Sequence, residues 1–239
     1  MHSILHHIIK AQRSIAILLD PEKIEIDQQI EVVSHCEQQF ESWKKELSIE
    51  FCCFFIGGST MNINMDEWLD SFKKITNIPI VIFPGSHEQL SENADGLLFL
   101  NLVSGRNPEY LIEQQVRAAH QLKNTTLEVI PTGYLLIDGD VESAVQQQSQ
   151  TAPILQDDIA AIIDTAYAAQ LMGNQLVYLE AGSGAQQSVA PKIVKAVADQ
   201  LTIPIIVGGG LRRNHQIENT FNAGATMVVV GTAVENNIL

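Results

Sequence analysis

The chain has 239 residues, 46% of them hydrophobic, and a formal net charge of −14 at pH 7. The length suits one domain over residues 1–239, because a (β/α)8 barrel has about 250 residues. The negative charge repels the phosphate backbone of nucleic acids, so nucleic-acid binding is not expected. Any phosphate site must therefore rely on backbone amides, helix ends and metal rather than on a basic surface.

The cysteines and the N-terminal segment indicate the compartment. Cys36, Cys52 and Cys53 lack the spacing of metal ligands and suit a reducing environment. The first ten residues lack the long apolar stretch of a signal peptide, and no segment reaches the roughly 18 apolar residues of a membrane span. We therefore expect a cytoplasmic protein without a stable membrane anchor.

Short apolar runs recur along the chain and predict strands of a buried parallel sheet. The expected strands are Ile15–Leu19, Phe51–Ile56, Ile80–Phe83, Gly96–Leu100, Leu127–Ile130, Leu176–Leu179, Ile203–Val207 and Met227–Val230. The expected helices are Asp27–Lys45, Pro108–Leu122, Asp157–Met172 and Pro191–Gln200. Only Ser86–Asn93 lies free between the third and fourth strands, so that helix is expected to be shortened or replaced by a loop.

Eight strand-helix units predict an α/β fold, a (β/α)8 TIM barrel. A doubly wound open sheet competes with it, but that fold needs a glycine-rich phosphate turn after the first strand. The turn here reads L-L-D-P-E-K at 18–23.

Two glycine-rich turns follow the last two strands and predict a phosphate clamp. Gly208, Gly209 and Gly210 follow the seventh strand, and Gly231 and Thr232 follow the eighth. Glycine lets backbone amides approach an anion closely, and in barrels the loops after strands seven and eight often bind phosphate.

Two further strand ends carry possible metal ligands. Asp20 follows the first strand, where a carboxylate either holds Mg²⁺ or caps the turn before Pro21. Ser59 follows the second strand after two glycines, in a turn that either supports the metal or a phosphate, or is an ordinary tight turn.

The sixth strand ends in the most distinctive group of residues. Tyr178 and Glu180 lie two apart and point to the same side of the strand. A carboxylate at the end of an apolar strand is a candidate ligand of substrate hydroxyls or a general base, or else part of a structural salt bridge. Gly182, Ser183 and Gly184 then supply a third turn able to cradle an anion.

Other polar residues near strand ends favour structural roles. Pro131 to Tyr134 are expected to form a packed turn after the fifth strand, with the tyrosine partly buried. Arg212 and Arg213 are either phosphate ligands or, as the amides already serve the anion, solvated helix residues. The glutamine tract at Gln146–Gln148 is expected on the surface.

Six motifs in chain order resemble those of geranylgeranylglyceryl phosphate synthases and the related bacterial heptaprenylglyceryl phosphate synthases. They are L-L-D-P-E-K at 18–23, F-I-G-G-S-T at 55–60, P-T-G-Y at 131–134, Y-L-E-A-G-S-G-A at 178–185, V-G-G-G at 207–210 and V-V-G-T-A-V at 229–234. The shorter bacterial branch carries a lysine two residues before the metal aspartate, where this chain has Leu18. The chain is therefore nearer the archaeal-type branch.

The resemblance implies a Mg²⁺-dependent prenyltransferase that joins sn-glycerol 1-phosphate to a polyprenyl diphosphate, with geranylgeranyl diphosphate as the expected donor. Asp20 and Ser59 match the metal positions, and Glu180 and Tyr178 the catalytic ones. The glycerol phosphate site is matched by Tyr178, Leu179, Glu180, Ala181, Gly182, Ser183, Gly184, Gly209, Gly210, Gly231 and Thr232. The family also implies a homo-oligomer, a dimer or larger, with transient membrane contact.

Two other functions stay open from the residues alone. One is a phosphate-binding barrel isomerase or lyase, which needs neither Mg²⁺ nor a lipid groove. The other is a barrel that binds a phosphorylated metabolite without turning it over. A metal requirement and an extractable lipid product distinguish the transferase from both.

Overall fold

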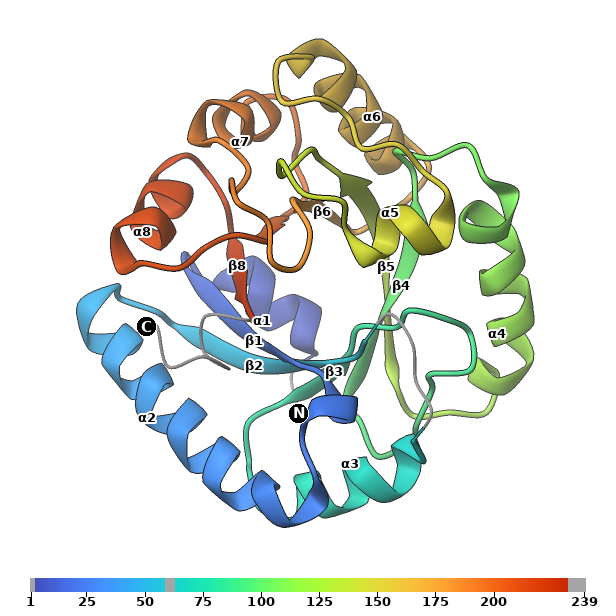
Figure 1. Ribbon diagram of the computed structural model, residues 1–239, viewed down its shortest axis with the longest axis vertical. Coiled ribbons are helices and arrows are strands. Elements are labelled where there is room, and N and C mark those ends of the chain that lie inside the picture. The colour runs from blue at the N-terminus through green and yellow to red at the C-terminus, as the bar shows by residue number, and fades with distance from the viewer. Residues whose placement is uncertain (1–2, 59–62, 232–239) are drawn as a thin grey trace.

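The computed structural model describes residues 3–58 and 63–231, which form a closed barrel of eight parallel strands (Figure 1). Each strand pairs with its sequence neighbours, and β1 closes the ring on β8. The prediction of a (β/α)8 TIM barrel is confirmed. The strands are β1 Ser14–Leu19, β2 Phe51–Ile56, β3 Ile80–Ile82, β4 Gly96–Leu102, β5 Glu128–Leu136, β6 Leu176–Glu180, β7 Ile205–Gly208 and β8 Met227–Val230.

Helices surround the barrel (Figure 1). They are α1 Ile4–Lys10, α2 Gln29–Glu46, α3 Met65–Lys73, α4 Gln114–Leu122, α5 Ala144–Ser149, α6 Ile159–Leu171, α7 Pro191–Ala198 and α8 Asn214–Asn222. A π-helix, Glu109–Glu113, leads directly into α4, so the predicted helix Pro108–Leu122 is continuous but changes its winding. No bounds are predicted from the sequence for α1, α3, α5 and α8.

The expected gap in the helical layer is present. Residues 83–95, between β3 and β4, contain no helix. A loop therefore separates α3 from α4 around the barrel (Figure 1). The outer side of β4 lies next to this loop, and this arrangement positions the cavity described below.

Strand residues alternate between the barrel interior and the helical layer. Tyr134 and Tyr178 belong to the interior cluster, whereas Leu179 packs outward against α6 and α7 residues such as Ile162 and Val194. Neither side of the sheet faces water, which explains why the strands read as continuous apolar runs.

The expected end of the fifth strand is wrong. Pro131 to Tyr134 are not a turn but the middle of β5, which continues to Leu136. Gly133 makes this possible, because a Cβ atom there would lie 2.6 Å from the Cβ of Ala169 on α6. The glycine lets α6 pack closely on the strand, and Tyr134 becomes a buried interior residue.

Helix α1 lies behind the strands in Figure 1, at the ends where they begin. The carboxylate of Glu128, the first residue of β5, accepts hydrogen bonds from the backbone amides of Ile4 and Leu5. A carboxylate is favourable at a helix N-terminus, where backbone donors are free. Ile4 and Ile8 are buried in the interior cluster, so α1 covers the end of the barrel opposite the cavity.

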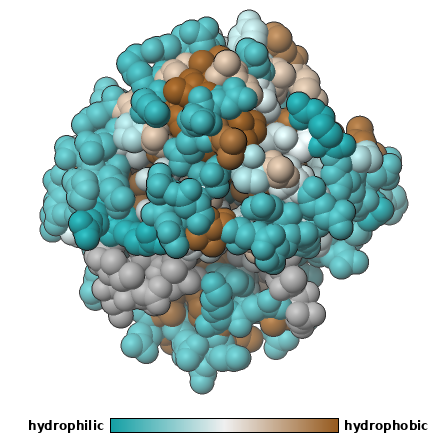
Figure 2. All heavy atoms as spheres, turned by 45° about the horizontal axis from the view of Figure 1, so that its top comes forward, coloured by the Kyte–Doolittle hydropathy of each residue, from teal (hydrophilic) through white to brown (hydrophobic). Residues whose placement is uncertain are grey.

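Within the described residues, no helix has the length and hydrophobicity required to cross a bilayer. The face drawn in Figure 2 is largely hydrophilic, with hydrophobic residues in separate clusters rather than in a continuous band.

Candidate active site

A cavity of about 470 Å³ opens at the carboxyl ends of the strands. One part is polar and is lined by Asp20, Glu180, Ser183 and the glycine turns. The other part is apolar and extends along β4 toward α4. A site with one polar end and one apolar arm suits a ligand that carries both an anionic group and a hydrocarbon chain.

Glu180 lies at the junction of the two parts and is 6% exposed. Its Oε1 atom accepts a hydrogen bond of 2.7 Å from the backbone amide of Gly182. Burial raises the pKa of its carboxyl above the ordinary glutamate value, and the Tyr178 hydroxyl and the Gly182 amide partly oppose this rise. Glu180 forms no ion pair with any described residue. The salt-bridge alternative is therefore wrong within this part of the chain.

Three aromatic rings line the cavity beside Glu180. Tyr178 lies 5.3 Å from Tyr134 and 5.5 Å from Phe83, measured between ring centroids. Burial and the nearby Glu180 carboxylate raise the pKa of both tyrosines well above their usual value, so their hydroxyls stay protonated. The buried Tyr178 hydroxyl lies beside the Glu180 carboxylate, but it makes no hydrogen bond of ordinary geometry with a described residue.

The turns after β6 and β7 need glycine because their backbone adopts positive φ. The values are 101° for Gly182, 76° for Gly184, 81° for Gly209 and 71° for Gly210. At Gly209 space is also lacking, since a Cβ atom would lie 2.5 Å from Glu180 Oε1 and 2.7 Å from the Gly182 nitrogen.

Backbone amides remain open in these turns. Those of Gly184, Gly209 and Gly210 make no hydrogen bond with another described residue. All three residues line the cavity. Unpaired amides on neighbouring turns are suited to an anion such as a phosphate group.

Of the two roles that the sequence leaves open for Asp20, the structure shows the turn cap, and the metal role stays a prediction. Its Oδ1 atom accepts the Glu22 amide at 3.1 Å and caps the short helical turn Pro21–Lys23. Its Oδ2 atom lies 3.6 Å from Lys23 Nζ, and the side chain also lines the cavity. Within residues 3–58 and 63–231, no three His, Cys, Asp or Glu side chains gather as a metal cluster. A metal here would be coordinated by Asp20 together with ligands other than a cluster of these side chains.

The structure brings most of the predicted site residues to one cavity. Its walls include Asp20, Tyr178, Glu180, Ser183, Gly184, Gly209, Gly210 and Gly231. Leu179 and Ala181 point outward into the helical layer, and the Gly182 amide is bonded to Glu180. Ser59 and Thr232 lie outside the described residues.

The apolar wall is the part that sequence reasoning misses. Leu97 and Phe99 belong to the outer cluster, and Leu98 and Leu100 to the inner one, yet all four line the cavity. Phe83 completes this wall. The signal was the long apolar run of β4 beside a unit without a helix.

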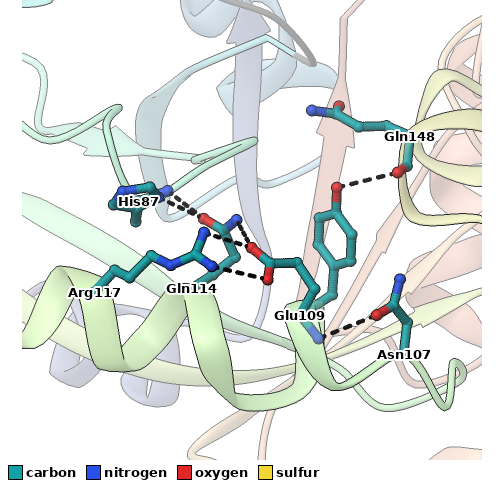
Figure 3. Close-up of polar contacts among 7 residues, drawn as sticks. His87, Asn107, Glu109, Gln114, Arg117 and Gln148 are labelled. Atoms are coloured by element: carbon teal, nitrogen blue, oxygen red, sulfur yellow. Dashed lines mark hydrogen bonds and ion pairs between the residues drawn. The ribbon is translucent and has the colours of Figure 1, made fainter.

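A chain of polar contacts crosses from the loop 83–95 to α4 (Figure 3). Gln114 Oε1 accepts hydrogen bonds from the His87 backbone amide at 2.7 Å and from His87 Nδ1 at 2.9 Å. Gln114 Nε2 donates to Glu109 Oε1 at 2.6 Å, and Arg117 pairs with the same carboxylate at 2.8 Å. His87 on the loop and Gln114 on α4 both line the cavity. We call this set of contacts the clasp, His87–Gln114–Glu109–Arg117, and it joins the loop to α4 beside the apolar part.

A second contact joins the π-helix to α5. The Tyr110 hydroxyl donates to the carbonyl of Gln148 at 3.1 Å (Figure 3). Gln148 is exposed, as the sequence predicts for the glutamine tract, but it also lines the cavity. A π-helix is rare and often marks a functional site.

Arg212 differs from expectation. Helix α8 begins at Asn214, so Arg212 and Arg213 are loop residues. Arg213 is exposed, but Arg212 is half-buried and lines the cavity. Its guanidinium donates to the carbonyls of Ala185 and Gly184, at 2.7 and 3.3 Å.

The chain is similar to known proteins along its whole length. The model of the PcrB family matches residues 6–238. The geranylgeranylglyceryl phosphate synthase of Zunongwangia profunda is 46% identical over 99% of this chain and 98% of that protein. That of Korarchaeum cryptofilum is 35% identical over 95% of this chain and 89% of that protein.

A solved structure is also similar. The crystal structure of (S)-3-O-geranylgeranylglyceryl phosphate synthase from Thermoplasma acidophilum, in complex with its substrate sn-glycerol-1-phosphate, matches with a TM-score of 0.86. Its sequence is 31% identical, and the match covers 98% of this chain and 92% of that chain.

Proposed function

The chain belongs to the PcrB family and is an enzyme of the geranylgeranylglyceryl phosphate synthase kind, and we propose that it joins sn-glycerol 1-phosphate to geranylgeranyl diphosphate. The observation that carries the proposal is the position of Glu180, a buried carboxylate without an ion-pair partner in the described residues. It lies where the open amides of the glycine turns meet the apolar wall. The relative from Thermoplasma acidophilum, which binds sn-glycerol-1-phosphate, supports the choice of acceptor.

The proposed acceptor lies in the polar part of the cavity. Its phosphate binds the amides of Gly184, Gly209 and Gly210, and its hydroxyls face Glu180. Fixing the phosphate places the attacking oxygen, which lowers the barrier through proximity. The Tyr178 hydroxyl, which stays protonated, is a donor for an oxygen of the acceptor.

Glu180 is proposed as the general base. The bond between the first carbon of the prenyl chain and its diphosphate breaks, and diphosphate leaves with the electron pair. The glycerol oxygen forms the new ether bond to that carbon, and its proton passes to Glu180. A carboxyl whose pKa is raised by burial is a stronger base than an exposed glutamate.

The apolar arm is proposed to hold the prenyl chain. Phe83, Leu98, Phe99 and Leu100 provide its wall. A hydrocarbon chain in this arm removes water from the reacting carbon and protects an allylic donor from hydrolysis. The names of the relatives support a geranylgeranyl chain.

Magnesium is proposed at Asp20, with Ser59, outside the described residues, as a further ligand. The donor set fits this ion, because Mg²⁺ commonly takes one or two protein carboxylates together with substrate phosphates. When bound, it would neutralise charge on the leaving diphosphate. Asp20 orients its carboxylate through the Glu22 amide, which leaves Oδ2 toward Lys23.

The expectation of a homo-oligomer in the cytoplasm, with transient membrane contact, also stays a proposal. Light scattering of the purified protein measures the oligomeric state directly. A monomer at all concentrations would contradict that part.

The test of the reaction is a turnover assay with radiolabelled sn-glycerol 1-phosphate, Mg²⁺ and a series of prenyl diphosphates, followed by extraction into organic solvent. We expect label in the organic phase, most with the geranylgeranyl donor and none with EDTA. A folded protein that binds glycerol phosphate but yields no extractable product with any donor contradicts the transferase. That result favours an isomerase, a lyase or a non-catalytic binding barrel.

A further inference from the structure

Arg212 joins the two glycine turns that the proposed phosphate site needs. Its backbone amide donates to Gln216 Oε1 at 3.0 Å, which fixes it to the first turn of α8. Its guanidinium reaches back to the turn after β6 and donates to the carbonyl of Ala185 at 2.7 Å and of Gly184 at 3.3 Å. One side chain thus connects the loop after β7 with the loop after β6.

The two carbonyls belong to peptide groups whose amides are also fixed. The Ala185 amide donates to Gly182 O at 3.2 Å, and the Gln186 amide donates to Gly139 O at 2.9 Å. Each of these peptide planes is therefore held on one edge by the backbone and on the other by Arg212. The open amide of Gly184 directly precedes them, so its direction depends on this support.

Arg212 also differs from the other cation near the site in having no carboxylate partner among the described residues. Among the described residues that line the cavity, Lys23 and Arg212 carry the fixed positive charges. Lys23 lies 3.6 Å from the carboxylate of Asp20, whereas Arg212 has no carboxylate partner within the described part of the chain. In a protein of net charge −14, an uncompensated guanidinium next to the open amides attracts an anion.

We propose that Arg212 is a positioning residue for the phosphate of the acceptor: it aligns the open amides of the turns and adds an uncompensated positive charge beside them. The inference rests on the proposed function, because it takes that cradle as the glycerol phosphate site. Both hydrogen bonds come from the same nitrogen, Nη2. The planar guanidinium holds this nitrogen in a fixed direction, whereas the ammonium group of lysine ends a flexible stem, so arginine is suited to the task.

The test measures binding of sn-glycerol 1-phosphate, and separately of inorganic phosphate, by calorimetry. The variants are R212Q, which removes the charge, and R212K, which keeps the charge but replaces the planar guanidinium with a flexible ammonium group. The control is R213Q, because Arg213 is adjacent, exposed and without a side-chain hydrogen bond among the described residues. Steady-state kinetics then give KM for each substrate, and thermal unfolding reports the fold.

We expect R212Q to weaken glycerol phosphate binding roughly 10- to 100-fold, as for the loss of charged hydrogen bonds, while KM for the prenyl diphosphate changes less than about twofold. R212K should fall between wild type and R212Q, and R213Q should match wild type. Wild-type affinity in R212Q overturns the inference. An equal rise of both KM values together with a lower melting temperature also overturns the inference. So does an R212K variant that binds like wild type, because the positive charge alone would then account for binding.

Failure of the inference and failure of the proposed function give different results. If wild type binds glycerol phosphate but transfers no prenyl group, the transferase is wrong while the Arg212 comparison still decides its own question. If R212Q binds normally and wild type turns over, only the role of Arg212 is wrong. A wild-type protein that binds neither probe overturns both.

Discussion

The Oε1 atom of Glu180 accepts the Gly182 amide at 2.7 Å and lies where a side chain on Gly209 would begin, 2.5 Å from an ideal Cβ there. The carboxylate on β6 therefore occupies space that the glycine after β7 leaves empty. This relationship couples the base to the backbone of two turns, and several predictions depend on it.

Gly209→Ala should abolish activity, with a fall on the order of 10²-fold or more, because the new Cβ displaces the carboxylate that the reaction needs. Gly173→Ala is the matched control. Gly173 has a φ of 94°, similar to the 81° of Gly209, but an added Cβ meets nothing within 4 Å. Both variants carry the strain of a left-handed backbone, roughly 1 kcal/mol, which thermal unfolding measures. Equal activities of the two would contradict the prediction.

Glu180→Gln should reduce kcat on the order of 10²- to 10⁴-fold, the usual contribution of a general base. The amide oxygen of glutamine can still accept the Gly182 hydrogen bond, so the local structure should persist. At neutral pH the variant should be as stable as wild type or more so, because it no longer buries an ionised group. Rapid kinetics and thermal unfolding check the two parts, and a variant with both low activity and a lower melting temperature would point to misfolding instead.

The raised pKa of Glu180 predicts opposite pH trends for activity and stability. Burial raises this pKa above the ordinary value of 4.5. Between the two values the folded protein binds more protons than the unfolded chain, so the contribution of Glu180 to stability falls as pH rises. The base works only when ionised, so kcat/KM rises through the same window. A pH profile of wild type and Glu180→Gln measures both, and a kcat/KM that stays flat down to the ordinary glutamate range would falsify the assignment.

Asp20→Asn should lower activity on the order of 10²-fold or more and raise the Mg²⁺ concentration needed for half-maximal rate, because a neutral amide is a weaker ligand. Stability should change little. Asparagine caps a helical turn as well as aspartate, and its oxygen can accept the Glu22 amide that Asp20 now binds at 3.1 Å. Titration of Mg²⁺ after EDTA treatment gives the constants, and an unchanged Mg²⁺ requirement would exclude Asp20 as a ligand.

Gln114→Leu should open the clasp between the loop 83–95 and α4. It removes both hydrogen bonds from His87 and the one to Glu109. Each bond contributes about 1 kcal/mol, so KM for the prenyl donor should rise about 5-fold if one of the three bonds supports the arm and about 100-fold if all three do, with KM for glycerol phosphate nearly constant. Arg117→Gln is the control, because it breaks only an exposed ion pair with Glu109. Equal shifts for both substrates, or in both variants, would contradict a role in the apolar arm.

The barrel and the polar part of the site follow from short-range patterns. Glycines directly after apolar strands, and Tyr178 two residues before Glu180, have fixed consequences for backbone and side-chain direction. The middle of β5 does not follow from such patterns, because Gly133 looks like a turn residue until Ala169 of α6 is known to pack against it.

The apolar arm and the role of Arg212 depend on contacts far apart in the sequence. Arg212 bonds to carbonyls 27 and 28 residues away, and no periodicity announces such a contact. Gln114 likewise looks like an ordinary helix residue in the sequence, because only the fold places His87 opposite it. Helices α1 and α8 are short and polar on one side, so packing rather than local preference stabilises them.

The missing helix after β3 means that the protein keeps part of its core unfilled. In a complete barrel a helix would cover Leu97 and Phe99, whereas here these side chains line a cavity. In the proposed reaction the hydrocarbon tail of the substrate supplies the apolar contacts that this helix would make in a complete barrel. Folding and catalysis are then linked, because each turnover releases one prenyl chain from the apolar arm and binds another. The free energy of unfolding is then lower for the enzyme without substrate than for the loaded enzyme.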